Sequence, residues 1–111
     1  MLAVQTIGSV NVIKVRSSLI GDCVEQCRQR VEDCLKQRKN QLAFDMSESP
    51  IVDSDGLEMI VDSQESCLSR GGKLVLIEPQ PICKEVLNIT GVEDFVAVFD
   101  DLRTALKDFA K

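Results

Sequence analysis

A short segment, Asp53-Ser54-Asp55-Gly56-Leu57, combines carboxylate and hydroxyl side chains where a loop is expected to enter a helix. The first turn of a helix has unpaired backbone N–H groups and the positive end of the helix dipole. That environment stabilises a phosphoserine or an Asp carboxylate. The simpler interpretation is a helix cap, since Ser and Asp are preferred capping residues. Asp55-x-x-Glu58 also fits a capping box with Asp55 as the cap.

A second candidate for chemistry is the acidic pair Asp45 and Asp53, which lies near the end of an expected strand. Carboxylates collected at strand ends suit Mg²⁺, as in response regulators. That class also needs an acidic pair after its first strand. Here the expected strand Val10–Val15 is followed by Arg16-Ser17 instead. The sequence therefore favours no metal site and no enzyme of this class.

Composition excludes several other activities. The 111 residues contain no His, so no nucleophile can be activated by an imidazole base. With no Trp or Tyr, only four Phe and a net charge of −5, binding to nucleic acid is not expected. No cofactor is indicated.

The cysteine pattern and the start of the chain bear on location. The five cysteines are odd in number and form no Cys-x-x-Cys pair, which favours reduced thiols in a cytoplasmic protein. A redox sensor is the alternative, and it requires a low thiol pKa. The first residues lack the basic start of a signal peptide, and no apolar run approaches the ~18 residues that span a membrane. We therefore expect no direct membrane insertion.

Alternating short apolar segments predict the elements that position these residues. Strands are expected at Leu2–Ile7 and Val10–Val15 around a Gly-Ser turn, with Val10 and Val12 on one face of the second strand and Ile13 and Val15 on the other. An amphipathic helix is expected from Cys23 to about Arg38, with Arg28 on its exposed side. Further strands are predicted at Gln41–Met46, Lys73–Ile77 and Phe95–Phe99, with a loop at Ser47–Pro50. Helices are predicted from about Leu57 to Leu68, from about Ile82 to Ile89, and after a cap at Asp100 or Asp101. In the first of these helices the inner stripe is formed by residues at helical spacing: Leu57, Ile60, Val61, Gln64 and Leu68.

The resulting order, ββαβαβαβα, is typical of an α/β fold with a mostly parallel sheet. We expect about four or five strands and about four helices, because short strands alternate with helical segments. No linker or repeat divides the chain, which predicts one domain over residues 1–111. Charge is uneven: residues 28–39 are mainly basic, whereas residues 40–69 carry seven acids and no Lys or Arg. Such an acidic stretch is either a solvated surface or a surface that selects its partner by charge.

Five segments in order carry a family resemblance. The segment at residues 53–57 is similar to the Asp-Ser-Ser-Gly-Leu signature of the STAS family, the sulphate-transporter and anti-sigma-factor-antagonist domains. The others that resemble family motifs are Leu42-Ala-Phe-Asp-Met-Ser47, Arg70-Gly-Gly-Lys-Leu-Val-Leu-Ile-Glu-Pro79, Val86-Leu-Asn-Ile-Thr-Gly-Val92 and Phe99-Asp-Asp-Leu-Arg-Thr-Ala-Leu106.

The resemblance implies a STAS-like fold and a non-enzymatic regulatory module. Stand-alone members bind an anti-sigma factor, often a Ser/Thr kinase, and so free a sigma factor. The kinase phosphorylates the Ser before Gly, and the phosphate weakens the complex. By this resemblance the partner is an anti-sigma factor or kinase-like protein, and the domain is a monomer or weak dimer. The partner-binding residues that the resemblance implies are Ser47, Pro50, Asp53, Ser54, Asp55, Gly56, Leu57 and Glu58.

This chain departs from the family pattern in three ways, one of which is a first helix richer in cysteine and basic residues than in typical members. Asp55 stands before Gly56, so a Ser kinase has no acceptor there. Asp55 is then a permanent mimic of the phosphorylated form, and Ser54 is a fallback acceptor. The usual Gly-x-Leu-Asp before the first helix is replaced by Ser17-Ser18-Leu19-Ile20. An alternative function is a STAS subunit of a lipid-transport or stress-signalling complex.

Overall fold

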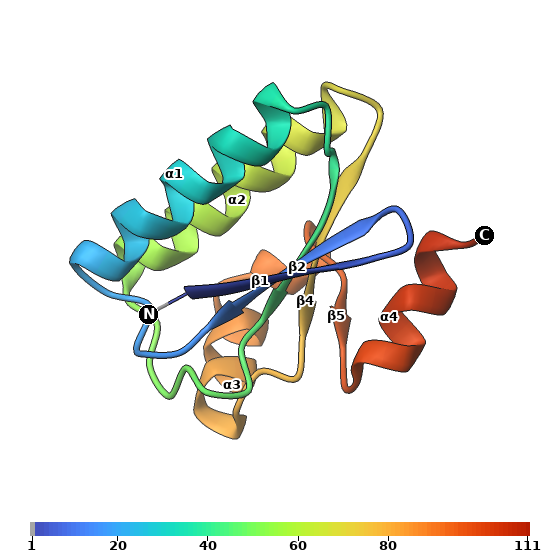
Figure 1. The fold of residues 1–111 in the computed structure, drawn as a ribbon. Coiled ribbons are helices and arrows are strands. Elements are labelled where there is room, and N and C mark those ends of the chain that lie inside the picture. Colours follow the sequence, from blue (N-terminus) through green and yellow to red (C-terminus); the bar gives the residue numbers. More distant parts are fainter. Residues whose placement is uncertain (1) are drawn as a thin grey trace.

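The structure is a computed structural model that describes residues 2–111 (Figure 1). It confirms the predicted alternation of strands and helices. In chain order the elements are β1 (Leu2–Ile7), β2 (Val10–Val15), α1 (Asp22–Lys36), β3 (Gln41–Asp45), α2 (Ser54–Leu68), β4 (Lys73–Ile77), α3 (Pro81–Ile89), a 3-10 turn (Val92–Asp94), β5 (Val98–Phe99) and α4 (Leu102–Phe109).

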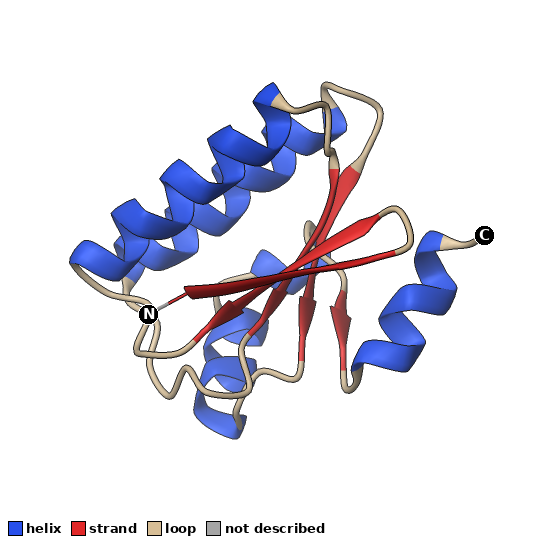
Figure 2. Cartoon of the chain, in the orientation of Figure 1, coloured by secondary structure: helices blue, strands red, loops and turns tan. Residues whose placement is uncertain are grey.

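The five strands lie side by side in the order β1-β2-β3-β4-β5. β1 is antiparallel to β2, and every later pairing is parallel, which confirms a mostly parallel sheet. Each parallel crossover adds its strand on the same side of the previous one. Since such crossovers are right-handed, α1, α2 and α3 must cover one face of the sheet. α4 follows the last strand and covers the other face (Figure 2).

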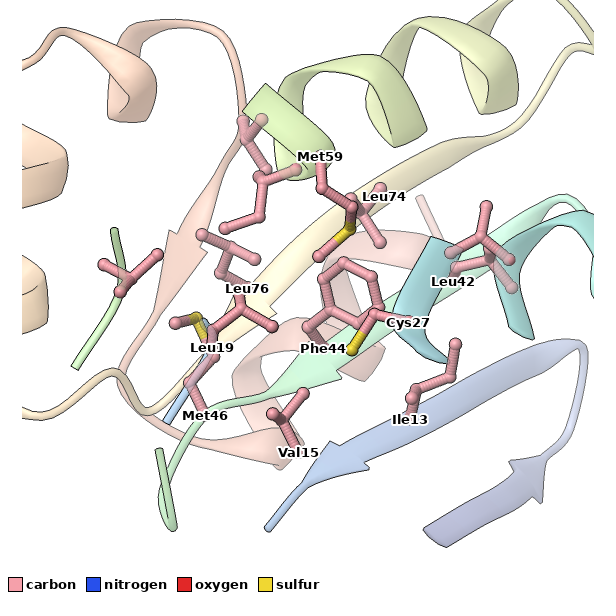
Figure 3. Close-up of a cluster of buried hydrophobic side chains, with 14 of the residues drawn as sticks. Ile13, Val15, Leu19, Cys27, Leu42, Phe44, Met46, Met59, Leu74 and Leu76 are labelled. Carbon is pink, nitrogen blue, oxygen red and sulfur yellow. The ribbon is translucent and has the colours of Figure 1, made fainter. Parts of the chain in front are cut away.

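The main core fills the space between the sheet and α1–α3. The alternation predicted for β2 is confirmed, since Ile13 and Val15 face this core whereas Val10 and Val12 face α4. Phe44 of β3 is fully buried at the centre, and Met59 of α2 and Cys27 of α1 lie over it (Figure 3). Burying such large side chains is the main force that holds the helices on the sheet.

A smaller core lies under α4. The sheet contributes Val10, Val12, Ala43, Val75 and Ile77, and α4 contributes Ala105 with the partly buried Leu102, Leu106 and Phe109. Lys73 of β4 forms an ion pair with Asp108, and its ammonium lies 5.1 Å from the centre of the Phe109 ring. These contacts fix the last helix to the sheet.

All five cysteines are buried free thiols. Desolvation and the neighbouring Cys23 raise the pKa of Cys27 to about 12, and burial raises the pKa of Cys67 to about 11. Raised pKa values leave little of the reactive thiolate at neutral pH. Cys27 and Cys67 therefore act as small hydrophobic side chains and give no support to the redox-sensor alternative.

Two predicted details are wrong. The last strand is only Val98–Phe99, because Gly91 starts a 3-10 turn in which the Phe95 and Val96 N–H groups both bond the Val92 carbonyl. Those N–H groups are then unavailable for pairing with β4. Leu68 is predicted on the inner stripe of α2 but is 49% exposed, since Cys67 takes the buried position.

Within residues 2–111, every helix is too short or too polar to cross a membrane.

Candidate functional site

The segment singled out by sequence lies where β3 leads through residues 46–53 into α2, at the carboxyl end of the parallel strands. A second loop, residues 16–21 between β2 and α1, lies against it. Leu19 and Val52 form a parallel β-bridge, and the Leu19 N–H donates to the Ile51 carbonyl at 2.7 Å. Because backbone hydrogen bonds join the two loops, each loop holds the other in place at the start of α2.

Asp53 is the N-cap of α2. Its Oδ1 accepts a hydrogen bond from the Gly56 N–H at 2.9 Å. The expected capping box with Asp55 as the cap is therefore wrong. Asp55 lies in the first turn of the helix, and Glu58 points toward Arg28 of α1, with 3.8 Å between Oε1 and Nη2. The cap lies two residues earlier because Asp53, in extended conformation, is the last residue before the helical backbone begins.

Gly56 is required by close packing. A Cβ atom at this position would lie 2.6 Å from the Leu19 carbonyl oxygen and 2.8 Å from Cγ2 of Val52. Any larger residue would push the start of α2 away from both loops. The glycine therefore brings the backbone of α2 into contact with the bridge between the loops.

The structure separates the eight predicted partner-binding residues by exposure. Pro50, Ser54, Asp55 and Glu58 are exposed, Ser47, Asp53 and Leu57 are half-buried, and Gly56 is buried. Ser54 and Asp55 form the exposed first turn of α2, and Leu57 packs against the main core. The exposed residues can contact a partner directly, whereas Gly56 and Asp53 position the backbone that carries them.

Further contacts immobilise the loop before α2. The Ser47 N–H donates to Asp45 Oδ1 at 3.0 Å, and Gln80 donates through Nε2 to the Ser47 carbonyl at 2.9 Å. Glu48 forms an ion pair with Lys14 at 3.0 Å and raises the pKa of that lysine. The loop is thus tied to β2, to β3 and to the start of α3.

Sequence reasoning missed the role of Arg28. The helical pattern put it on the exposed face of α1, but its guanidinium lies among three carboxylates, at 3.8 Å from Glu25, 3.8 Å from Glu58 and 3.0 Å from Asp62. The basic character of α1 beside the acidic character of α2 was the signal for this contact. Arg28 offsets part of the acidic charge on the side of α2 but does not reach Asp55.

Sequence reasoning also missed two exposed apolar side chains. Ile20 is 43% exposed and Ile51 is 54% exposed, and each stands next to a residue of the Leu19–Val52 bridge. Both lie in loops, where hydrophobic periodicity gives no signal. Together with Ser54 and Asp55 they make a surface of apolar and acidic groups, which we call the α2-entrance surface.

The alternative Mg²⁺ site finds no support in the geometry. Asp45 and Asp53 each accept a backbone N–H, from Ser47 and Gly56 respectively. Across residues 2–111, no group of three or more Cys, Asp or Glu side chains is arranged to hold a metal ion. The two carboxylates instead fix the turn after β3 and the start of α2.

Comparison with known proteins finds a family whose pattern matches this chain, and solved structures that have the same fold. The pattern of the STAS domain matches residues 1–105. A relative from Thermotoga neapolitana, named as a candidate anti-sigma factor antagonist, is 29% identical over 77 residues, which is 69% of this chain and 68% of that protein.

Two solved structures are similar in fold. A candidate anti-sigma factor antagonist from Thermotoga maritima superposes with a TM-score of 0.94 at 22% identity, covering 99% of this chain and 95% of that one. The unphosphorylated anti-sigma factor antagonist SpoIIAA, whose phosphorylated form is described from Bacillus, gives 0.83 at 16% identity, covering 97% of this chain and 95% of that one.

Proposed function

The chain belongs to the STAS domain family, and from that premise we propose that it is a non-enzymatic regulatory module that binds an anti-sigma factor. Its similar proteins are named as anti-sigma factor antagonists. In this proposal, binding sequesters the anti-sigma factor and releases a sigma factor. The partner is a Ser/Thr-kinase-like protein, as the sequence resemblance implies.

The observation that carries this proposal is the α2-entrance surface. Its backbone is held by the Asp53 cap, by close packing at Gly56 and by the Leu19–Val52 bridge. Its exposed side chains are short, so little conformational entropy is lost when a partner covers them. A rigid surface with a few apolar side chains among polar ones is suited to protein binding. We propose that Ser47, Pro50, Asp53, Ser54, Asp55, Gly56, Leu57 and Glu58 form or position this contact.

Asp55 sets the state of the module in this proposal. A phosphoserine in an interface repels acidic partner groups and must lose its hydration when the partner binds. Asp55 places a permanent negative charge at the corresponding position, on the exposed first turn of α2. The natural protein is then held in the weakly binding state. Ser54, exposed beside it, is the remaining hydroxyl that a kinase can reach.

The test is the affinity for the anti-sigma factor of the same organism, measured by calorimetry with wild type and with Asp55→Ser. We expect Asp55→Ser to bind at least about tenfold more tightly, which corresponds to about 1.4 kcal/mol. The matched control is Glu65→Ser, which removes one exposed acid from the same helix away from the α2-entrance surface. An equal gain in affinity for both variants would mean that the change in net charge, rather than the position of Asp55, causes the tighter binding.

Capture of the natural partner from host cells separates the proposal from its alternative. Wild type and Asp55→Ser serve as paired baits, and bound proteins are identified by mass spectrometry. A kinase-like or sigma-regulating protein enriched on Asp55→Ser supports the proposal. A lipid-transporter subunit or a stress-complex subunit, captured equally by both baits, contradicts it.

A further inference from the structure

The outer edge of the sheet at β1 is open. Within residues 2–111, β1 pairs with β2 on one side and with no strand on the other. Its six residues, Leu-Ala-Val-Gln-Thr-Ile, include no charge and no proline. Edge strands of monomers are usually protected by Lys, Pro, a bulge or short length. The opposite edge is protected in this way, since β5 has only two residues. β1 has none of these features, and its register with β2 is unbroken over six residue pairs.

Hairpin geometry decides which groups of β1 face outward. The turn has two residues between Ile7 and Val10, and Gly8 at its first position has φ 60°. In such a hairpin the residues next to the turn form a hydrogen-bonded pair, and bonded pairs alternate along the strands. The backbone groups of Ile7, Gln5 and Ala3 therefore bond β2. The N–H and C=O groups of Leu2, Val4 and Thr6 point to the open edge.

We propose that β1 pairs in antiparallel fashion with β1 of a second copy of this chain, about a twofold axis at Val4. Opposite residues in an antiparallel pair must both present their backbone groups to each other. Even-numbered residues must then face even-numbered ones. The register that uses Leu2, Val4 and Thr6 all at once places Val4 opposite Val4 of the second copy and Leu2 opposite Thr6.

The helix next to this edge carries matching charges. Two hollows lie between β1 and α1: one of 330 Å³ lined by Leu2, and one of 200 Å³ lined by Val4 and Thr6. Arg30 and Asp33 of α1 line both hollows, so they stand beside the middle of β1. Asp33 accepts a hydrogen bond from Gln29, whereas Arg30 forms no ion pair with any residue from 2 to 111.

This charge pair identifies the occupant as a second copy. A twofold axis near the middle of β1 makes the two α1 helices run antiparallel, so that Arg30 of one copy faces Asp33 of the other. The surface is therefore complementary to itself in charge as well as in backbone hydrogen bonds. The rest of the molecule carries a net charge of −5 and repels another copy. Lys39 also lines the hollow beside Val4 and Thr6, so no excess of negative charge stands at this edge. The uncharged strand beside Arg30 and Asp33 is the place where two copies can meet.

The first test is the mass of the chain in solution as a function of concentration. Sedimentation velocity from about 10 µM to about 1 mM should show a monomer giving way to a dimer. Hydrogen exchange followed by NMR locates the contact. Amides of Val4 and Thr6 should become protected as the dimer forms, while those of Gln5 and Ile7 are already protected by β2. A monomer throughout, or a dimer in which Val4 and Thr6 still exchange freely, overturns the proposal.

The second test exchanges charges at the axis. Val4→Lys and Val4→Glu each place two like charges opposite one another, so each alone should raise the dimer dissociation constant at least about tenfold. An equal mixture of the two variants pairs Lys with Glu and should restore the dimer. Gln5→Lys is the control: it adds the same charge to the same strand, but the register places Ala3 of the second copy opposite it. Failure of the mixture to dimerise, with both variants folded by circular dichroism, overturns the twofold register.

Discussion

Two helices of this protein begin with the same capping interaction in different surroundings. At α2, Asp53 Oδ1 accepts the Gly56 N–H at 2.9 Å, and at α4, Asp101 Oδ1 accepts the Thr104 N–H at 2.7 Å. Gly56 is buried against two loops, whereas Thr104 is exposed. The hydrogen bond is the same, but only at α2 does the capped N–H belong to a glycine packed closely against two loops.

This difference shows what distinguishes a binding surface from an ordinary helix start. A capping Asp satisfies backbone N–H groups wherever a helix begins. At α2 the Leu19–Val52 bridge also fixes where the backbone lies, so Ser54 and Asp55 project from a rigid base. At α4 no such bridge exists among the described residues, and the first turn is held from one side by the small core. Packing under the cap, rather than the cap, makes the α2 entrance suitable for recognition.

The largest effect should come from removing the close approach at Gly56. Gly56→Ala places a methyl group 2.6 Å from a backbone oxygen that cannot rotate away, and we expect a loss of about 3 kcal/mol in unfolding free energy. Urea denaturation measures this loss. Thr104→Ala, at the matched position of α4, should change stability by less than about 0.5 kcal/mol. Similar losses for the two variants would remove the distinction between the helix starts.

Removing the caps should have an intermediate effect, larger at α2. Asp53→Ala should cost about 1–2 kcal/mol, because it leaves the Gly56 N–H without a partner in a half-buried site. Asp101→Ala should cost less, since water replaces the carboxylate at the exposed Thr104 N–H. Thermal denaturation of both variants gives the order, and the reverse order contradicts the comparison.

Acid should loosen α4 through its cap. The Thr104 N–H bond lowers the pKa of Asp101 below its usual 3.8. A group with a lowered folded pKa stabilises the fold above its unfolded pKa, and this stabilisation is lost as pH falls through the folded pKa. The Thr104 amide resonance should therefore be constant above about pH 5 and shift at lower pH with a midpoint below 3.8. A midpoint at or above that value would show that the cap bond is not formed in solution.

The smallest effect on stability is expected at Asp55. Its side chain is exposed and interacts with α2 only through the dipole, so Asp55→Ala should cost about 0.5 kcal/mol or less. The measurement is urea denaturation beside Asp53→Ala. A loss as large as that of Asp53→Ala would mean that Asp55 also bonds the helix start. A small loss would mean that Asp53 stabilises the start of α2, whereas Asp55 is exposed there without stabilising it.

The sequence predicts the fold well because most elements are set by local patterns. Period-two alternation places Ile13 and Val15 opposite Val10 and Val12, and this is observed. The sequence placed the cap of α4 at Asp100 or Asp101, and the structure shows that Asp101 is the cap. The predicted last strand, Phe95–Phe99, is longer than the observed β5, since the turn after Gly91 uses N–H groups that a strand would need. These hydrogen bonds are local, within residues 92–96, but hydrophobic periodicity carries no signal for them.

The candidate site was only partly visible in the sequence. The motif located the α2 entrance, but both Asp53 and Asp55 are good caps, and only the backbone conformation decides between them. The contact of Gly56 with Leu19 joins residues far apart in the chain. Ile20 and Ile51 became visible as exposed apolar neighbours only when the bridge brought their loops together.

The strand order has a consequence for how the chain is made. Each strand of the sheet pairs with the strand immediately before it in the sequence, so the sheet can grow in the direction of synthesis, one unit at a time. The hairpin of β1 and β2 is available first as a template. The apolar face formed by Val12, Ala43 and Val75 stays uncovered until α4, the last helix, leaves the ribosome. Until then the nascent domain exposes an apolar face through which it can aggregate. That face is covered once α4, residues 102–109, packs on it.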